Sequence, residues 1–293
     1  NSGLATYFRE FIRPELEKWA EDNEKSDGTN YNLYTDGLRI YTTIDSRIQE
    51  AAEASMARNM AYLQEKFDAH WSRTKPWQEN KAILDDALKR TPSYKRLKKT
   101  GLAHTEIIKR LSQKHAVDLF THSGMVEKQL STTDSLSHYL MLLHSGLVAL
   151  DPSNGHIKAW IGGINYNQFK YDHVKTAKRQ VGSTFKPFVY AAALQKGIDP
   201  CEHISASRTE YENLEGWTPN NADSKENVMK YSFTGALAKS VNTVTIKLLE
   251  EVGIKEVLET AQRMGVEKKL PQNPSVALGT ASIPLLEMTL KGN

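Results

Sequence analysis

The chain has 293 residues and a formal net charge of +3, with 39% hydrophobic and 25% charged residues. This hydrophobic share can fill the core of one large domain, or of a moderate domain with an appendage, which excludes a disordered chain. Cys201 is the only cysteine, so a disulfide framework and a thiolate cluster are both excluded. The nine histidines are scattered without the spacing of a zinc site.

The first 45 residues are predicted to be extended. Residues Leu38, Ile40 and Thr42 alternate with Arg39, Tyr41 and Thr43, and Asp36-Gly37 can turn the chain ahead of them. Asp45 is then a suitable N-cap, and apolar residues follow it at helical spacing. We therefore expect a helix from about residue 46 to residue 67.

Residues 68–140 are predicted to be mostly helical and polar, with breaks at Pro76 and Pro92. Within them, residues 81–114 hold ten Lys or Arg against three Asp or Glu, a net charge of +7. Such a block could meet anionic lipid headgroups, an anionic polymer or nucleic acid. Apolar residues recur there at helix-like spacing, which favours a solvated helical insertion. Aromatic residues are sparse and no reader motif is present, so nucleic acid is not expected as a partner.

Two strands are predicted at residues 146–150 and 156–161, around the turn sequence Asp151-Pro152-Ser153-Asn154-Gly155. Helices are predicted to dominate from Phe185 to Met264. The expected fold class is therefore α+β, with an antiparallel sheet begun by this hairpin and helices packed on it.

The sequence Ser183-Thr184-Phe185-Lys186 follows Gly182 and opens a small and apolar stretch that Gly197 is placed to close. Three positions along a helix bring the Ser183 hydroxyl and the Lys186 amine to one face. A serine needs a proton acceptor to act as a nucleophile, and a lysine can serve if burial keeps it neutral. The alternative is an N-cap serine beside a surface lysine, since S-x-x-K by itself is a weak pattern.

Downstream, Ser240-Val241-Asn242 lies between two apolar stretches and is predicted to join two helices. A second hydroxyl and an amide in the same cleft could relay a proton and hold a substrate amide. The alternative is that Ser240 and Asn242 cap the second helix. Their position after S-x-x-K favours the catalytic interpretation.

These motifs and their contexts resemble the penicillin-binding proteins, specifically the bifunctional class A type that carries a glycosyltransferase ahead of its transpeptidase. The resemblance is dense in the second half of the chain, at residues 146–152, 155–163, 179–187, 217–221, 239–243 and 278–280. Residues 7–14 and 42–52 resemble the segment between the two catalytic domains. Residues 64–140 show no such resemblance.

The resemblance implies that Ser183 is the acylated nucleophile and Lys186 its proton acceptor. It also implies that Ser240 shuttles a proton toward the leaving group and that Asn242 binds the peptide backbone. Three further residues are expected to bind substrate: Trp217, Asn220 and Thr243. The implied domains are a linker region with a basic helical insertion at residues 1–140, and the N-terminal part of a transpeptidase domain of the penicillin-binding protein and serine β-lactamase fold at residues 141–293.

The third motif of the family, K-[TS]-G on an edge strand, is expected beyond residues 278–280. Lys99-Thr100-Gly101 matches its letters but precedes S-x-x-K and closes a charged run, so we expect Gly101 to end a helix instead. The expectation is that the transpeptidase fold is incomplete at the C-terminus of these 293 residues. They should be inactive alone, because the motif supplies part of the oxyanion hole.

The implied activity is that of a D,D-transpeptidase, which cross-links peptidoglycan stem peptides and is trapped by β-lactams. The implied location is the periplasmic face of the bacterial inner membrane, through an anchor outside this sequence, and no cofactor is expected. One alternative is a serine β-lactamase, which the class A-like flanks oppose. Another is a catalytically silent scaffold or glycan-binding module, which the intact set Ser183, Lys186, Ser240 and Asn242 opposes.

Overall fold

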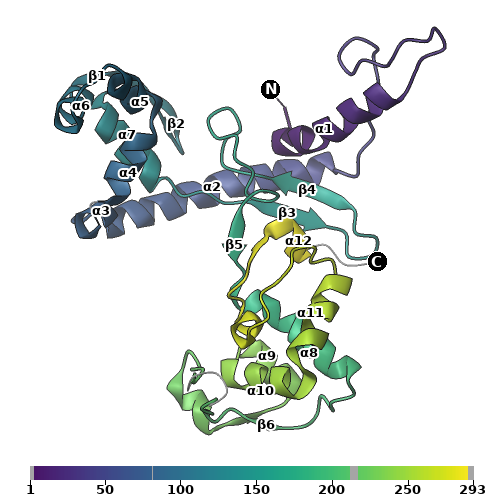
Figure 1. The fold of residues 1–293 in the computed structure, drawn as a ribbon. Helices are drawn as coiled ribbons and strands as arrows, with labels where there is room; N and C mark the ends of the chain where they lie inside the picture. Colours follow the sequence, from purple (N-terminus) through teal and green to yellow (C-terminus); the bar gives the residue numbers. More distant parts are fainter. Residues whose placement is uncertain (1–2, 81, 212–216, 290–293) are drawn as a thin grey trace. The chain divides into compact units, whose positions relative to one another are not determined.

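The computed structural model describes residues 3–80, 82–211 and 217–289, and Figure 1 labels their helices and strands. The chain divides into two compact units. Unit 1 comprises Asn1–Tyr41, Asp45–Gly146 and Ile161–Lys170, and unit 2 comprises Thr42–Ile44, Leu147–Trp160 and Tyr171–Asn293. No helix in the described residues is both long enough and apolar enough to cross a membrane.

Unit 1 begins with the helix α1 (Thr6–Asp22), so the prediction of an extended N-terminal segment is wrong over these residues. Pro14 lies inside the helix, where it removes a backbone hydrogen bond. Arg13 forms an ion pair with Glu10 and, across Pro14, a second one with Glu17, each at 2.9 Å. The apolar residues near the start of α1 include Tyr7, which is buried and whose hydroxyl donates to the Phe169 carbonyl oxygen at 2.6 Å.

The second helix, α2 (Ser46–His70), confirms the helix predicted after Asp45, whose carboxylate accepts from the Arg47 N–H. The alternation between Leu38 and Thr43 produces no strand. Near the C-terminal end of α2, the Gln64 side chain is nine-tenths buried. It pairs with the backbone at residues 141–143, donating to the Met141 carbonyl oxygen and accepting from the Leu143 N–H.

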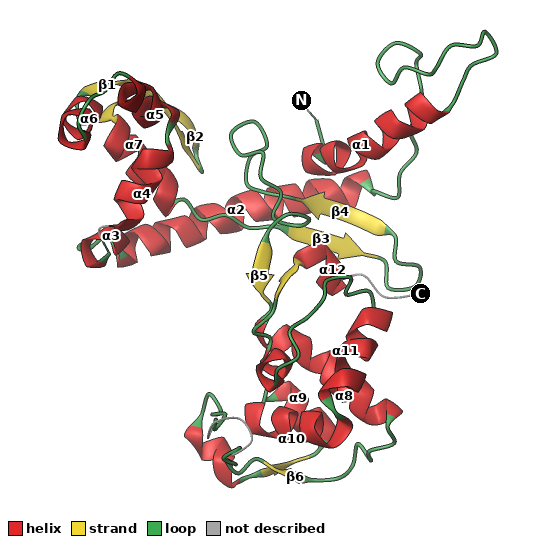
Figure 2. Ribbon diagram, viewed as in Figure 1, coloured by secondary structure: helices red, strands yellow, loops and turns green. Residues whose placement is uncertain are grey.

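The remaining described residues of unit 1 form four short helices, a β-hairpin and a further helix, which Figure 2 shows. They are α3 (Pro76–Glu79), α4 (Ala82–Arg90), α5 (Pro92–Lys99), α6 (His104–Leu111), β1 (Lys114–Thr121), β2 (Gly124–Ser131) and α7 (Thr132–Met141). The helical region is interrupted at Pro76 and Pro92, as predicted, and each proline is the first residue of the helix that follows. The helical prediction is wrong for residues 114–131, where β1 and β2 pair antiparallel from Lys114↔Ser131 to Thr121↔Gly124.

Unit 2 opens with β3 (Leu147–Leu150) and β4 (Ile157–Ile161), the predicted hairpin. Two more short pairs are antiparallel: β5 (Lys178–Gln180) with β8 (Ser282–Pro284), and β6 (Ile204–Ser205) with β7 (Lys230–Tyr231). The β5–β8 pair brings residues about 100 positions apart together, immediately ahead of Ser183.

Helices dominate the remainder of unit 2, as predicted, and the class is α+β. They are the 3₁₀ turns η1 (Gly182–Phe185), η3 (Ser224–Val228) and η4 (Pro274–Leu278), and the helices α8 (Lys186–Gln195), α9 (Phe233–Ala238), α10 (Asn242–Val252), α11 (Ile254–Arg263) and α12 (Leu285–Thr289). In Figure 1, α8 and α10 lie side by side, and they share one apolar core with α11 and η4. That core includes Phe185, Val189, Val244, Ile246, Leu248, Val257 and Val276, none of them exposed.

Candidate active site

Ser183 lies in the single 3₁₀ turn η1, directly ahead of α8, and its side chain is exposed. Gly197, in the left-handed region at φ +87°, ends α8 as predicted. Among the described residues the Ser183 hydroxyl makes no hydrogen bond, which leaves it available to a ligand. Lys186, one turn further, begins α8 and is only 1% exposed.

The Lys186 amine is held by the motif that the sequence predicted as its partner. Nζ donates to the carbonyl oxygen of Ser240 at 2.5 Å, to Ser240 Oγ at 3.0 Å and to Asn242 Oδ1 at 2.7 Å. These three acceptors match the three N–H bonds of an ammonium group. The structure therefore brings Lys186, Ser240 and Asn242 together.

Burial has a direct effect on the protonation of this amine. It lowers the pKa of Lys186 from 10.5 to about 8, and the negative charge of Glu226 acts in the opposite direction. A lysine with a pKa near 8 is neutral in a substantial fraction of molecules at neutral to mildly alkaline pH. It can then give up one of its three donated bonds and accept a proton through its lone pair.

Ser240 has a backbone conformation that is uncommon for a residue with a side chain, at φ +56°. Its N–H donates to the Leu237 carbonyl oxygen, while its own carbonyl and its hydroxyl both accept from Lys186. In this left-handed conformation, the carbonyl oxygen and the hydroxyl of Ser240 both face the Lys186 amine. Backbone strain of this kind is found at functional sites.

The side chain of Asn242 has a defined orientation. Its Nδ2 donates to the Asn220 carbonyl oxygen at 2.8 Å, and a carbonyl can only accept. Oδ1 is therefore the atom that faces Lys186. Asn220 contributes its backbone here, and substrate binding by its exposed side chain stays a prediction.

Asn221 is a functional candidate that the sequence reasoning missed. Its Oδ1 accepts from the N–H groups of Asn242 at 2.9 Å and Thr243 at 3.1 Å. The Thr243 side chain is 1% exposed, and its hydroxyl donates to the Ala206 carbonyl oxygen at 2.9 Å. These contacts give Thr243 a structural task, and its role in substrate binding stays a prediction. No spacing rule in the sequence links residue 221 to residue 242.

Trp217 forms an isolated bridge with Tyr211 and packs, partly buried, against the core of unit 2. Its ring lies 6.1 Å from that of Tyr211, centre to centre. A packing role accounts for these contacts, and a role in substrate binding stays a prediction.

Two glycines, Gly182 and Gly279, fix the turn that carries Ser183. Gly279 has φ +76°, and its carbonyl oxygen accepts from the Gly182 N–H at 2.9 Å. A Cβ atom at Gly279 would lie 1.8 Å from the Gly182 carbonyl oxygen, so only glycine fits. Val181 also donates to the Ala281 carbonyl oxygen, which extends the β5–β8 pairing up to the nucleophile turn.

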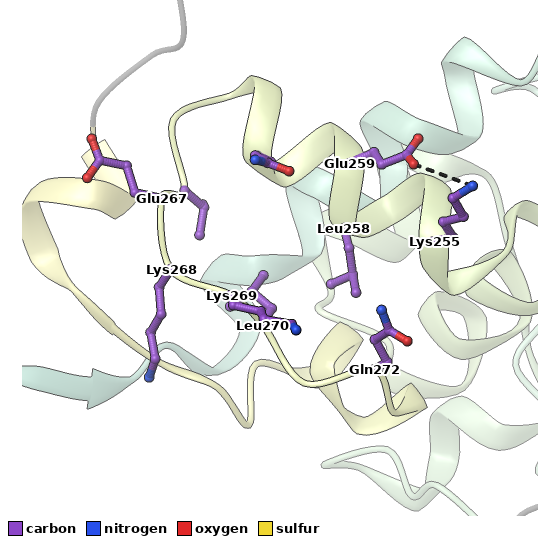
Figure 3. A pocket seen from close by; sticks show the side chains of 10 residues that line it. Lys255, Leu258, Glu259, Glu267, Lys268, Lys269, Leu270 and Gln272 are labelled. Atoms are coloured by element: carbon purple, nitrogen blue, oxygen red, sulfur yellow. Dashed lines mark ion pairs between the residues drawn. The ribbon is translucent and has the colours of Figure 1, made fainter.

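Two other features lie outside this site. The pocket in Figure 3, about 430 Å³, is lined by charged residues such as Lys255 and Glu259 and by apolar ones such as Leu258. No residue of either motif lines it. Lys99-Thr100-Gly101 ends α5, with Thr100 as the C-cap and Gly101 at φ +82°, as predicted.

Comparison with known protein families agrees with this arrangement. Residues 145–277 match the model described as penicillin binding protein transpeptidase domain, and residues 70–143 match that described as penicillin-binding protein middle domain. The second match covers most of the region for which the sequence motifs gave no resemblance. The chain belongs to the penicillin-binding proteins and carries residues of their transpeptidase domain.

Individual relatives to which the chain is similar are penicillin-binding proteins 1A. The chain is 29% identical to penicillin-binding protein 1A of Aquifex aeolicus (strain VF5), over 87% of this chain and 36% of the relative. It is 36% identical to penicillin-binding protein 1A of Pseudomonas aeruginosa, over 49% of this chain and 18% of the relative. It thus spans well under half the length of these relatives.

A solved structure supports the fold. The crystal structure of penicillin-binding protein 1A from Haemophilus influenzae superposes with a TM-score of 0.60 at 22% identity, covering 97% of this chain and 44% of that one. The division of the sequence at residues 140 and 141 stays a prediction beside these findings. The two compact units divide near residues 146 and 147, and residues 161–170 belong to unit 1.

Proposed function

We propose that this protein is a serine-type D,D-transpeptidase that cross-links peptidoglycan stem peptides. The single observation that carries this proposal is the buried Lys186 amine, one turn from the exposed Ser183 and hydrogen-bonded to Ser240 and Asn242. Its lowered pKa provides the neutral amine that a serine nucleophile requires.

In the proposed reaction, neutral Lys186 takes the proton of the Ser183 hydroxyl as Oγ attacks the carbonyl carbon of the penultimate D-Ala. The C–N bond to the terminal D-Ala breaks, and its nitrogen receives a proton relayed through the Ser240 hydroxyl. The acyl group remains on Ser183 as an ester. An amine of a second stem peptide then attacks this ester, forms the cross-link and restores the serine hydroxyl; water in its place gives carboxypeptidase activity.

The same arrangement predicts inhibition by β-lactams. A β-lactam resembles the D-Ala-D-Ala end, and its ring opening would leave a long-lived ester on Ser183. The proposed partners are accordingly stem peptides and β-lactams. The proposed location is the periplasmic face of the inner membrane, with an anchor and a glycosyltransferase in parts of the protein outside this chain.

The test is covalent labelling of the full-length protein with a fluorescent penicillin. We expect the label on Ser183, identified by mass spectrometry of the tryptic peptide, and no label on Ser183→Ala. Because Ser183 is exposed and makes no hydrogen bond among the described residues, the variant should keep the melting temperature of the wild type. Labelling that survives this substitution contradicts the proposal. Slow release of the label separates a transpeptidase from a β-lactamase.

A further inference from the structure

The helix α10 begins without a cap of its own. Its N-cap position is Val241, whose side chain cannot accept a hydrogen bond. The first N–H groups of a helix have no partner within the helix and need one from elsewhere. Asn242, which faces the Lys186 amine, is the first residue of this helix.

Asn221, about twenty residues upstream, supplies the missing acceptor. Its Oδ1 accepts from both Asn242 N and Thr243 N, which is the role a local N-cap side chain has in other helices. Its Nδ2 donates to Asn227 Oδ1 at 2.9 Å and to Thr243 Oγ1 at 3.0 Å. One amide group therefore ties the start of α10 to the loop before it and to the turn η3.

We propose that Asn221 is a positioning residue for proton transfer: by capping α10 from a distance, it fixes Asn242 and thereby the acceptor that Asn242 presents to Lys186. The adjacent residue completes the arrangement, since the Asn220 carbonyl sets the orientation of the Asn242 amide. Among the hydrogen bonds of the described residues, none joins Asn221 to Ser183 or Lys186. Its effect on the reaction is transmitted through the first turn of α10.

The kinetic part of this inference rests on the proposed function, whereas its structural part does not. Two variants of Asn221 in the full-length protein test the kinetic part and the structural part separately. Asn221→Ala removes the acceptor and both donors. Asn221→Asp keeps an oxygen for the two backbone N–H groups and adds a negative charge at the positive end of a helix, where it is favourable.

The first measurement is hydrogen exchange of the backbone amides of Asn242 and Thr243, which needs no activity. We expect Asn221→Ala to lose their protection and Asn221→Asp to keep it. The second measurement is the acylation rate with a fluorescent penicillin as a function of pH. A misplaced Asn242 should lower the maximal rate of Asn221→Ala by on the order of tenfold to a hundredfold. The Asp variant should retain most of it.

The pH profiles should move in opposite directions. In Asn221→Ala the ammonium form of Lys186 loses a well-placed acceptor, so the midpoint of the profile should fall. In Asn221→Asp the added negative charge favours the ammonium form, so the midpoint should rise. A merely structural role would lower the amount of folded protein without moving the midpoint of Asn221→Ala.

Thr91→Ala is the matched control, because Thr91 caps α5 in unit 1 through its hydroxyl and the Tyr94 N–H. It should leave the acylation rate and the pH profile unchanged. The inference is overturned if Asn221→Ala acylates like the wild type with the same midpoint, or if the amides of Asn242 and Thr243 keep their protection. If the wild type takes up no penicillin, the proposed function fails, and hydrogen exchange still decides whether Asn221 holds this turn.

Discussion

The junction of α8 and α10 in unit 2 and the basic helices of unit 1 hold their charged groups in different ways. Lys186 is 1% exposed, and its partners are 54 and 56 residues away in sequence. Lys89 on α4 has a side chain 46% exposed, and its partner Asp85 lies one turn away on the same helix. Both lysines are hydrogen-bonded, yet only the first is withdrawn from water.

The consequences for protonation are opposite. Burial lowers the pKa of Lys186, whereas the hydrogen bond with Asp85 raises the pKa of Lys89. A local pair on an exposed helix face thus favours the charged form, which is useful for solubility and for meeting anions. Burial of the Lys186 amine, in spite of its acceptors, makes a neutral base accessible. The comparison shows that the environment, and not the residue type, decides the direction in which the pKa of a lysine moves.

Among the substitutions that test this comparison, Lys186→Arg should have the largest effect on the acylation rate. Arginine keeps the positive charge but provides no neutral acceptor near pH 7, so the acylation rate should fall by ~10² to 10⁴. The measurement is the rate of penicillin labelling, with the melting temperature taken in parallel. Lys89→Arg is the matched control and should acylate like the wild type. A rate for Lys186→Arg within a few-fold of the wild type would show that Lys186 is structural.

Gly279→Ala should have an intermediate effect, because it moves the nucleophile turn without touching Ser183. The new Cβ would meet the Gly182 carbonyl oxygen at 1.8 Å, and the turn must shift to relieve this contact. We expect a fall in acylation on the order of tenfold to a hundredfold, with a destabilisation of about 1–3 kcal/mol.

Gly101→Ala provides the control for this backbone conformation. Gly101 has a similar φ of +82°, but nothing lies within 4 Å of its added Cβ atom. The control should cost stability through the left-handed conformation alone and leave acylation unchanged. Equal acylation of the two variants would mean that Gly279 does not position Ser183.

A change of pH should alter the acylation rate less than these substitutions do. With a Lys186 pKa of about 8, the neutral fraction and the acylation rate should rise about tenfold between pH 7 and pH 9. In the unfolded chain the pKa returns to 10.5, so the unfolded state binds more protons between pH 8 and pH 10.5. The contribution of Lys186 to the free energy of unfolding should therefore rise with pH in this window. A rate profile flat from pH 7 to pH 9 would contradict the assignment.

Much of unit 2 could be predicted from the sequence because its signals are local. The β3–β4 hairpin follows from its turn residues, and α8 from its apolar run and Gly197. The contact of Lys186 with Ser240 and Asn242 could be predicted only through the family resemblance, since no periodicity links residues 54 apart.

The errors have identifiable physical causes. Helix α1 carries Pro14 in its interior, which is an unfavourable signal for a helix. Strands β1 and β2 are exposed over most of their length and bury little beyond Leu119 and Phe120, so they lack a regular apolar alternation. The cap on α10 was missed for another reason: it comes from the distant Asn221, and sequence rules for caps consider only adjacent residues.

The left-handed backbone of Ser240 implies a conflict between stability and activity at that position. A glycine would adopt φ +56° without the steric cost that a side chain incurs there. It would also remove the hydroxyl that contacts Lys186. Selection for folding alone would therefore favour glycine at position 240, and selection for turnover would favour serine. A library scored once for abundance and once for penicillin uptake should rank these two residues in opposite orders.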